Sequence, residues 1–377
     1  MKFTVQRNLF INDLNSVLRA VSSRAQIPIL SGIKLDLTET ELIMTGSNAD
    51  ISIELSQPVS DDLRVESTGS IVVTAHLFSE IVRKLPGREF TFEVKEGNQI
   101  QITSDKADYV INGLDAGAYP RLPEIAGTSF SLPPKTLREL ITQTVFAVST
   151  EESRPTLTGV NFNFSFKNGQ IKAVATDSHR LSQRIVDIAA GPSEDLSLII
   201  PGKNLQELAQ IIGDADQDIK VYLGDSQIRF EFENLSFYTR LLEGAYPDVD
   251  RLLPTESTTS VQFTVSDLMQ TLSRASLLTH ANRTNAVQMT LNVADQTVLV
   301  SGNSPEVGKI EEEVGFSSLT GRDLTISFNP DYMAAALRAS VTDSVIINFT
   351  ESLRPFTVVP NDQSVEFVQL ITPIRTF

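Results

Sequence analysis

The chain has 377 residues, 41% of them hydrophobic, and a formal net charge of −16, which predicts a globular protein of two or three domains. The sequence contains no cysteine, which excludes disulfides and thiolate chemistry, and its three histidines lie too far apart for a metal motif. No apolar run could span a membrane, and the first ten residues lack the apolar core of a signal peptide, so we expect a cytoplasmic protein.

The first third of the chain predicts two amphipathic helices separated by strands. A set of apolar residues from Phe10 to Val21 recurs at helical spacing, and a second such set runs from Phe78 to Leu85. Between the two sets, hydrophobic and polar residues alternate in ELIMTGSNADISIEL, which is typical of strands.

The same unit occurs again 127 residues later. IPILSGIKLDL, which begins at Ile27, matches RPTLTGVNFNF, which begins at Arg154, and GAYP occurs at both 117–120 and 244–247. At each apolar helix position of the first copy, the residue 127 positions later is also apolar. We expect this single offset to hold without a gap, as in an internal duplication.

A third and more diverged copy occupies the C-terminal part. Ser266 is predicted to cap a helix that carries Leu268 and Leu272. Asn329 followed by Pro330 predicts the start of the second helix of this copy. Alternating segments such as TVLVSGNSPEVGKIEEEV and SVIINFTE predict its strands.

Each copy therefore combines two helices with many short strands. The helices are too few to cross over between every pair of strands, so the predicted fold class is α+β, with two helices packed on antiparallel sheet in each copy. The boundaries are placed in segments rich in proline, serine, threonine or glycine. The predicted domains are residues 1–126, 127–254 and 255–377.

The most enzyme-like string is Thr176-Asp177-Ser178-His179-Arg180, which contains the residue types of a nucleophilic triad. Neighbours on a strand point to opposite faces, whereas a triad converges from separated positions. We therefore keep three interpretations of this string. It forms a polar strand end, it belongs to a binding surface, or, as an alternative, Asp177 and His179 catalyse hydrolysis. Neither a phosphate-binding loop nor a dinucleotide-binding glycine motif accompanies the string.

Basic residues gather on the predicted helices of this acidic chain. The negative net charge alone favours a protein that avoids nucleic acid, and the three glutamates at 311–313 are typical of a solvated face. Helix-borne cations in such a chain favour a charge-segregated surface with one basic face. The cations on or beside helices are Arg19, Arg24, Arg83, Lys84, Lys135, Arg138, Lys203, Arg274 and Arg338.

Several strings, in order along the whole chain, resemble the bacterial DNA sliding clamp family, the beta subunits of DNA polymerase III. They are MKFTV at the start, VATDSHRLS at 174–182, GAYPDVDRLLP at 244–254, ISFNPDYM at 326–333 and LITPIR at 370–375. SRPTLTGV and FYTRLLEGAYPD are most similar to clamps of low-GC Gram-positive bacteria. The combination of a triplicated unit with these strings is specific to that family.

The resemblance implies a non-catalytic processivity factor without cofactor or metal. In the family, two chains join head to tail into a ring of six similar domains, whose inner helices face duplex DNA without reading its bases. The implied partners are DNA, a second copy, the replicative polymerase, the clamp loader, and repair and translesion polymerases that carry Gln-Leu-x-Leu-Phe-type motifs. If such a chain is classed as a nucleotidyltransferase, the class describes the polymerase holoenzyme to which the clamp belongs. A peptide-binding scaffold without DNA contact and the hydrolase stay open as alternatives.

The family carries one partner-docking pocket per chain, between the second and third domains. Such a pocket has aliphatic walls and a few polar groups that orient a peptide. The resemblance assigns to it Leu157, Thr176, Ser178, His179, Arg180, Leu181, Pro247, Arg251 and Leu252 from the second copy, with Asn329, Tyr332, Leu353, Pro355, Thr372, Pro373, Ile374 and Arg375 from the third.

The resemblance also assigns residues to the dimer interface and to DNA contact. A strand of one chain is implied to face a helix end of the other chain, and two cations are implied to touch DNA. They are Tyr109 and Ile111 facing Leu277 and Leu278 of the other chain, with Arg24 and Lys203 for DNA.

The sequence departs from the family at three places that bear on these sites. Ser178 stands where many clamps have glycine, and Thr284 falls about where some have phenylalanine. A tyrosine pair that touches DNA in some clamps is absent near Pro155. The first two differences bear on the motif preference of the pocket, and the third limits the predicted DNA contacts to the two cations.

Overall fold

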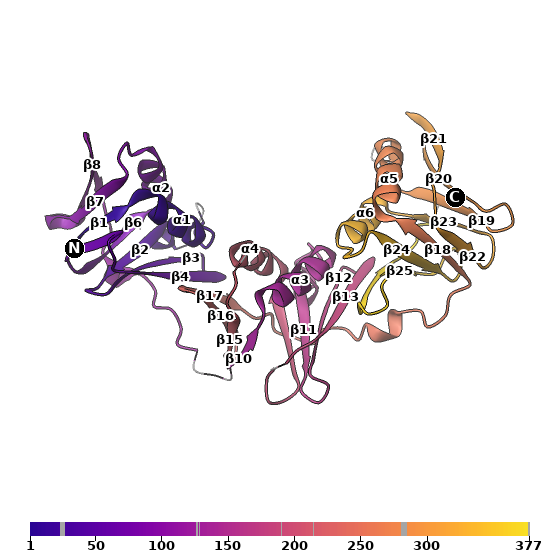
Figure 1. Ribbon diagram of the computed structural model, residues 1–377, viewed down its shortest axis with the longest axis horizontal. Coiled ribbons are helices and arrows are strands. Elements are labelled where there is room, and N and C mark those ends of the chain that lie inside the picture. Colours follow the sequence, from indigo (N-terminus) through magenta and orange to yellow (C-terminus); the bar gives the residue numbers. More distant parts are fainter. Residues whose placement is uncertain are drawn as a thin grey trace. The chain divides into compact units, whose positions relative to one another are not determined.

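The computed structural model describes residues 1–22, 27–125, 127, 129–189, 191–213, 215–279 and 285–375. The chain divides into two compact units, and Figure 1 labels most of their helices and strands. Unit 1 comprises Met1–Pro134 with Glu207–Leu241, and unit 2 comprises Lys135–Gln206 with Leu242–Phe377. The α-helices are α1 (Arg7–Leu18), α2 (Ala75–Lys84), α3 (Pro134–Thr144), α4 (Gly202–Ile212), α5 (Val265–Thr279) and α6 (Pro330–Arg338), and the 3-10 helices are η1 (Pro28–Ser31), η2 (Glu96–Asn98), η3 (Ala116–Ala118), η4 (Val145–Ala147), η5 (Pro155–Thr158) and η6 (Asp250–Leu252).

Unit 1 contains two sheets in which every pair of neighbouring strands is antiparallel. The five-stranded sheet has the order β5-β1-β7-β8-β9, and the eight-stranded sheet has the order β10-β15-β16-β17-β4-β3-β2-β6. The strands are β1 (Lys2–Gln6), β2 (Gly32–Leu37), β3 (Glu41–Ser47), β4 (Ile51–Pro58), β5 (Leu63–Ser67), β6 (Gly69–Thr74), β7 (Glu89–Val94), β8 (Gln99–Ser104), β9 (Ala107–Asn112), β10 (Ser129–Leu132), β15 (Ile219–Leu223), β16 (Gln227–Phe232) and β17 (Leu235–Arg240).

Unit 2 is built in the same way from a nine-stranded and a four-stranded antiparallel sheet. Their orders are β14-β11-β12-β13-β26-β25-β24-β18-β22 and β21-β20-β19-β23. The strands are β11 (Gly159–Ser165), β12 (Gln170–Thr176), β13 (Arg180–Asp187), β14 (Leu196–Pro201), β18 (Thr259–Thr264), β19 (Val287–Asn292), β20 (Thr297–Ser304), β21 (Gly308–Glu313), β22 (Ser318–Thr320), β23 (Leu324–Phe328), β24 (Ser344–Phe349), β25 (Phe356–Pro360) and β26 (Phe367–Ile371). Two helices per repeat and antiparallel pairing throughout confirm the predicted α+β class.

The apolar faces predicted for the helices form the core of the first repeat. In Figure 1, α1 and α2 lie side by side over the strands of unit 1. Phe10 of α1 and Phe78 of α2 meet at a ring-centroid distance of 5.7 Å, and Phe10 also meets Phe90 at 5.2 Å. All three side chains are at most 1% exposed. Burial of this aromatic cluster is the main stabilising contribution that the amphipathic pattern predicts.

Consecutive repeats are joined by strands that pair edge to edge. β4 of the first repeat pairs with β17 of the second, and β13 of the second pairs with β26 of the third. In each repeat, three strands follow the first helix. The third of these strands, β4 or β13, pairs with the last strand of the next repeat, β17 or β26. Each joint is therefore a main-chain hydrogen-bond ladder, which holds the repeats in a fixed register.

The prediction of a single gap-free offset of 127 is wrong in one hairpin. Lys34 pairs with Thr45 in the first repeat, whereas Asn161 pairs with Val174 in the second. The first members of these pairs differ by 127 positions and the second members by 129. The hairpin segment between paired residues Phe164 and Ile171 is therefore two residues longer than the segment between Leu37 and Leu42. The offset returns to 127 at β6 and β14.

The two predicted helix starts in the third repeat differ in outcome. Asn329 does cap α6, because its side chain accepts the backbone N–H of Asp331 at 2.8 Å, and Pro330 is the first helical residue. The prediction for Ser266 is wrong, since α5 begins at Val265 and Ser266 lies in its first turn.

Asp13 on α1 gives a stability prediction, because burial raises the pKa of its carboxyl from 3.8 to about 6. The folded chain therefore binds a proton more tightly than the unfolded chain, and this carboxylate destabilises the fold as pH rises from 4 to 6. We expect Asp13→Asn to raise the free energy of unfolding by about 1–2 kcal/mol at pH 7.5. Urea unfolding should show that this gain disappears below pH 4, and a gain that is equal at both pH values would contradict the assignment.

Candidate functional site

The string Thr176–Arg180 forms a tight turn between β12 and β13, and Asp177 organises it. One carboxylate oxygen of Asp177 accepts the backbone N–H groups of His179 and Arg180, each at 2.9 Å. The other accepts Arg180 Nε at 2.9 Å, and the two side chains are only 18% and 13% exposed. Charge-assisted hydrogen bonds of this kind are the strong ones, so the turn is held rigidly.

Ser178 lies in the left-handed backbone region, with φ at +78°. Its backbone N–H donates to Thr176 Oγ1 at 3.1 Å, and its hydroxyl oxygen accepts Arg154 Nη1 at 3.0 Å. Glycine adopts this conformation without the Cβ penalty that other residues meet. The turn geometry thus favours glycine at this position, and Ser178 adopts it with some backbone strain.

The conformation of Ser178 predicts how substitutions act on stability. We expect Ser178→Gly to change the free energy of unfolding by less than about 0.5 kcal/mol, because it trades one hydrogen bond for relief of strain. Ser178→Val should lower it by about 1–2 kcal/mol, since a β-branched residue strongly disfavours positive φ. Urea unfolding measures both changes, with a substitution at the exposed Thr325 of edge strand β23, Thr325→Val, as the control. Equal stability of the valine and glycine variants would refute the prediction.

An apolar cluster lies beside this turn on the face of the nine-stranded sheet that carries Leu181. Leu181 pairs with Thr176 on one side and with Leu370 on the other, so it stands at the joint between the second and third repeats. The Tyr246 hydroxyl oxygen accepts the Thr176 N–H at 3.0 Å, which anchors the connecting segment onto the sheet. The buried members of the cluster are Val174, Leu181, Val249 and Leu370, with partly buried Tyr246 and Leu253 packed against them.

The third repeat contacts the same turn through Tyr332 and Thr372. The Arg180 guanidinium carbon lies 4.6 Å from the centroid of the Tyr332 ring on α6, a cation–π distance. The His179 carbonyl accepts both the backbone N–H of Thr372, at 2.9 Å, and its hydroxyl, at 2.8 Å. His179 and Thr372, which are 193 positions apart in sequence, are therefore held together at the strand ends.

The remaining residues assigned to the pocket differ in burial. Leu157 is 7% exposed, and Asn329 serves as the cap of α6. Leu252 and Leu353 are 54% and 58% exposed, which leaves large apolar side chains accessible to a ligand. The Arg251 side chain is 88% exposed, in an ion pair with Asp248 at 3.2 Å. The half-buried or exposed others are Pro247, Pro355, Pro373, Ile374 and Arg375.

The geometry of the turn does not support the hydrolase alternative. A triad requires an aspartate that orients the imidazole of the base. Both carboxylate oxygens of Asp177 instead accept hydrogen bonds from backbone groups and from the Arg180 guanidinium. Asp177 therefore acts as a structural acceptor that shapes the end of the strand.

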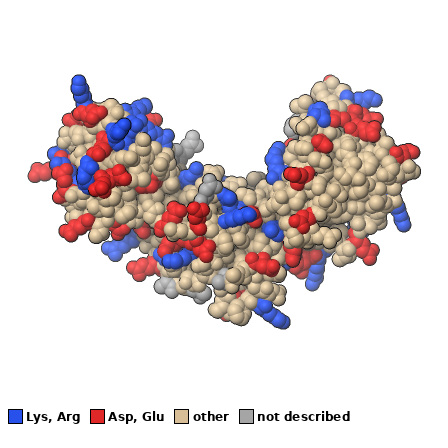
Figure 2. Space-filling view, viewed as in Figure 1, with Lys and Arg blue, Asp and Glu red and all other residues tan. Residues whose placement is uncertain are grey.

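The helix-borne cations fall into two groups. Arg19 forms an ion pair with Glu207 at 3.0 Å, and Arg274 Nε donates to Glu312 at 2.8 Å, which lowers the pKa of Glu312. Lys203 is exposed on the first turn of α4 and takes part in no ion pair among the described residues. Figure 2 shows basic side chains gathered over α2, beside acidic ones. Arg24 lies outside the described residues.

The residues assigned to the dimer interface lie at an exposed strand and a helix end. β9 is the edge strand of its five-stranded sheet, and Tyr109 on it is 37% exposed while Ile111 is half-buried. Leu277 in the last turn of α5 is 73% exposed, and Leu278 is half-buried. Apolar side chains of this size at a sheet edge are typical of an interface.

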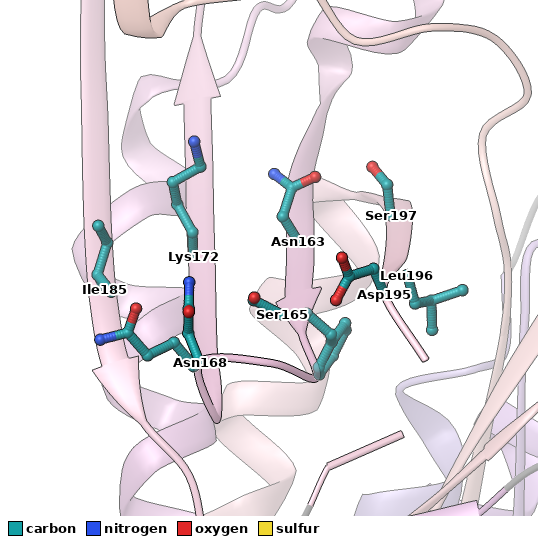
Figure 3. Close-up of a pocket in the computed structure, with 10 residues that line it drawn as sticks. Asn163, Ser165, Asn168, Lys172, Ile185, Asp195, Leu196 and Ser197 are labelled. Carbon is teal, nitrogen blue, oxygen red and sulfur yellow. The ribbon is translucent and has the colours of Figure 1, made fainter. Parts of the chain in front are cut away.

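A separate cavity of about 450 Å³ opens on the same sheet face, farther along β11 to β14 (Figure 3). Lys172 and Asn163, which pair across β11 and β12, extend from neighbouring strands in this view. Lys172 also holds Asp250 at 2.8 Å. None of the residues assigned to the pocket lines this cavity, whose lining is Asn163, Phe164, Ser165, Asn168, Gln170, Lys172, Ile185, Asp195, Leu196 and Ser197.

Comparison with known proteins identifies the family. Models of the DNA polymerase III beta subunit match in chain order, with the N-terminal domain at residues 1–123, the central domain at 131–248 and the C-terminal domain at 250–375. The chain belongs to the beta sliding clamp family. It is 44% identical to the beta sliding clamp of Streptococcus pneumoniae, with 99% of both chains covered, and 40% identical to that of Bacillus subtilis, with 100% of both covered.

Solved clamp structures have the same fold over the whole chain. The DNA polymerase III beta chain of Streptococcus pneumoniae superposes with a TM-score of 0.96 at 43% identity, and the sliding clamp of Bacillus subtilis with 0.94 at 40%. Both comparisons cover 100% of each chain. The predicted resemblance to clamps of Gram-positive bacteria is thus confirmed, and the chain is a DNA polymerase III sliding clamp of three clamp domains.

Two features of the clamp add to what the sequence predicted. Tyr246 and Val249 belong to the apolar cluster, although only Pro247, Arg251 and Leu252 of this segment were assigned to the pocket from the sequence. The GAYP string repeated at 117–120 and 244–247 was the available signal for Tyr246. Within the described residues, no helix is long and apolar enough to cross a membrane, and no cluster of three or more metal-ligating side chains is found. Thr284 lies outside the described residues.

Proposed function

We propose that two copies of this clamp close into a ring around duplex DNA, in the cytoplasm, and tether the replicative polymerase to its template. The clamp performs no chemistry itself. The polymerase class number 2.7.7.7 that accompanies the Streptococcus pneumoniae structure is, on this proposal, a label of the holoenzyme. The clamp loader and repair or translesion polymerases dock on the same ring.

The observation that carries the ring is the pair of strand edges left open in the chain. β4 and β13 each pair with the last strand of the following repeat. β21 is the equivalent strand of the third repeat and β9 is the last strand of the first, and both are edge strands of their sheets. Pairing β21 of one copy with β9 of another repeats the internal joint. A head-to-tail contact forms a ring when its rotation closes, and the clamp family implies closure with two copies.

The side chains at these edges support the same pairing. Val110 beside Tyr109 is 61% exposed, and Leu277 is 73% exposed. An uncovered edge strand with large apolar residues is an aggregation hazard unless a partner covers it. A second copy whose Leu277 and Leu278 face Tyr109 and Ile111 would cover both.

The joint between the second and third repeats supports a peptide-docking pocket. The rigid Asp177 turn presents Arg180 and His179 beside the apolar cluster around Leu181. Tyr332 and Thr372 bring the third repeat to the same turn. Apolar walls with a few fixed polar groups fit a short motif of the Gln-Leu-x-Leu-Phe type, and Leu252 and Leu353 extend the apolar surface.

Contact with DNA should be weak, because the clamp holds DNA by topology. Arg24 and Lys203 are the proposed contacts, and the net charge of −16 opposes adsorption of DNA on the outside. We expect a dissociation constant weaker than ~10⁻⁶ M for a short linear duplex at physiological salt, with a shallow salt dependence that reflects few neutralised phosphates.

Retention on circular DNA tests the proposal. The protein is loaded on nicked circular DNA with a clamp loader, separated from unbound protein by gel filtration, and the circle is then cut. We expect the clamp to stay on the circle and to leave the linear product. Retention on both forms would show an ordinary DNA-binding protein, and retention on neither would leave the scaffold or hydrolase alternatives.

A further inference from the structure

The joint between the first and second repeats carries a groove that matches the proposed pocket position by position. With the two-residue difference in hairpin length taken into account, Ser47 and Ser52 correspond to Thr176 and Leu181, since each is a directly opposed pair across its hairpin. Ala49 then corresponds to Ser178, and both have φ at +78°. The two turns are therefore built alike.

The hydrogen bonds of the two turns agree as well. The Asn48 side-chain oxygen accepts the backbone N–H groups of Asp50 and Ile51, each at 3.0 Å, as Asp177 accepts those of His179 and Arg180. Tyr119 of the first GAYP string is 5% exposed, and burial raises its pKa to about 12, so it stays protonated and takes the place of Tyr246.

The first joint also encloses a cavity, of about 220 Å³. Tyr238 pairs with Ser52 as Leu370 pairs with Leu181, so an aromatic ring replaces leucine in the wall. The volume lies below the range of pockets for whole small molecules, so it fits one or two side chains of a longer ligand. The lining is Ile27, Leu30, Ser47, Ala49, Asp50, Ser52, Pro120, Arg121, Leu122, Pro123, Gln227, Tyr238, Thr239 and Arg240.

The lining of this groove carries more basic than acidic side chains. Arg121 and Arg240 are both exposed, and neither forms an ion pair among the described residues. Asp50 is the single acidic side chain in the lining. Two arginines against one aspartate make the groove locally positive, although the chain has a net charge of −16. A positive groove favours an acidic ligand. Ile27, which is 47% exposed, offers an apolar contact at the same place.

We propose that this groove is a second peptide-docking site, which takes an acidic linear segment of a partner protein with one apolar anchor side chain. The anchor enters the cavity beside Leu30 and Tyr238, and flanking carboxylates meet Arg121 and Arg240. The inference rests on the proposed peptide pocket at the second joint, because it extends the same architecture to the first. A partner with two motifs could then hold one protomer at two points.

The test measures binding of a fluorescent acidic peptide, Glu-Leu-Asp-Leu-Phe, to the full-length protein whose second joint is disabled by Leu181→Ala with Tyr332→Ala. We expect residual binding that falls at least ~10-fold when Arg121→Glu and Arg240→Glu are added. The matched control adds Arg88→Glu and Lys106→Glu, two exposed cations of unit 1 outside the groove, and should keep the binding. Equal affinities of the two charge-reversed proteins, or no residual binding, would overturn the proposal.

Hydrogen exchange locates the peptide independently of the variants. Saturating peptide should protect the backbone amides of residues 47–52 and 238–240, and protection confined to residues 176–181 in the unmodified chain would place it only at the second joint. The proposed function is tested separately by the neutral peptide Gln-Leu-Ser-Leu-Phe, which should bind the unmodified chain whatever the acidic peptide does.

Discussion

Truncation after Ile371, or Tyr332→Ala combined with Leu181→Ala, should abolish binding of a Gln-Leu-x-Leu-Phe peptide while the dimer remains intact. The truncation removes Thr372, whose N–H and hydroxyl both bind the His179 carbonyl, and with it one wall of the proposed pocket. The double variant removes an aromatic ring that lies 4.6 Å from Arg180 and a leucine that is 2% exposed. Apolar anchors of this kind each contribute about 2 kcal/mol or more, so we expect a loss of at least ~100-fold in affinity.

Calorimetry of peptide binding, run beside sedimentation of the same proteins, measures this result. The matched control is Val341→Ala, because Val341 is 45% exposed in the third repeat and lies outside the pocket. The control should bind the peptide with unchanged affinity. A truncated protein that is still dimeric and binds the peptide as tightly as the full chain would show that the pocket lies elsewhere.

The sequence predicted the fold class because the repeat and the helical patterns agree with each other. The apolar positions that recur at helical spacing in α1 and α2 are the ones that pack, as Phe10 and Phe78 do at 5.7 Å. Asn329 was identified correctly because its cap and the following proline act locally. Local signals of this kind survive in sequence because each needs only a few neighbouring residues.

The two-residue difference between the first and second repeats could not be seen in the pattern. Side chains alternate along a strand with a period of two, so two extra residues in a turn leave every later residue on its original face. The hydrophobic pattern therefore fits an offset of 127 and one of 129 equally well. Only the pairing of Lys34 with Thr45 and of Asn161 with Val174 separates them.

The geometry of the candidate site also needed long-range information. The resemblance named Arg180 and Tyr332, but their cation–π contact joins a strand end of one repeat to a helix of the next. Asp177 was a candidate catalytic residue because a carboxylate accepts hydrogen bonds both in a catalytic triad and in a structural turn. Its hydrogen bonds to the backbone of the turn are what distinguish a structural acceptor from a triad member.

Leu277→Asp combined with Leu278→Asp should convert the dimer into a folded monomer. Leu277 is 73% exposed on the last turn of α5, so a charge there costs the isolated chain little, and the half-buried Leu278 costs more. In the proposed ring the same positions face Tyr109 and Ile111 of the partner copy at the centre of the joint. Two buried carboxylates without partners there would each cost several kcal/mol, which exceeds what one strand ladder and its rim contacts recover.

Sedimentation equilibrium measures the oligomeric state, and circular dichroism shows whether the fold is kept. The control is Phe166→Asp, because Phe166 is 63% exposed in the turn between β11 and β12 and belongs to neither β9 nor β21. It should remain dimeric. The monomer should still bind the Gln-Leu-x-Leu-Phe peptide, since the pocket is built within one chain, but it should be lost from circular DNA, since a half-ring encloses nothing. A double variant that sediments as a dimer and stays on the circle would show that the ring closes through other surfaces.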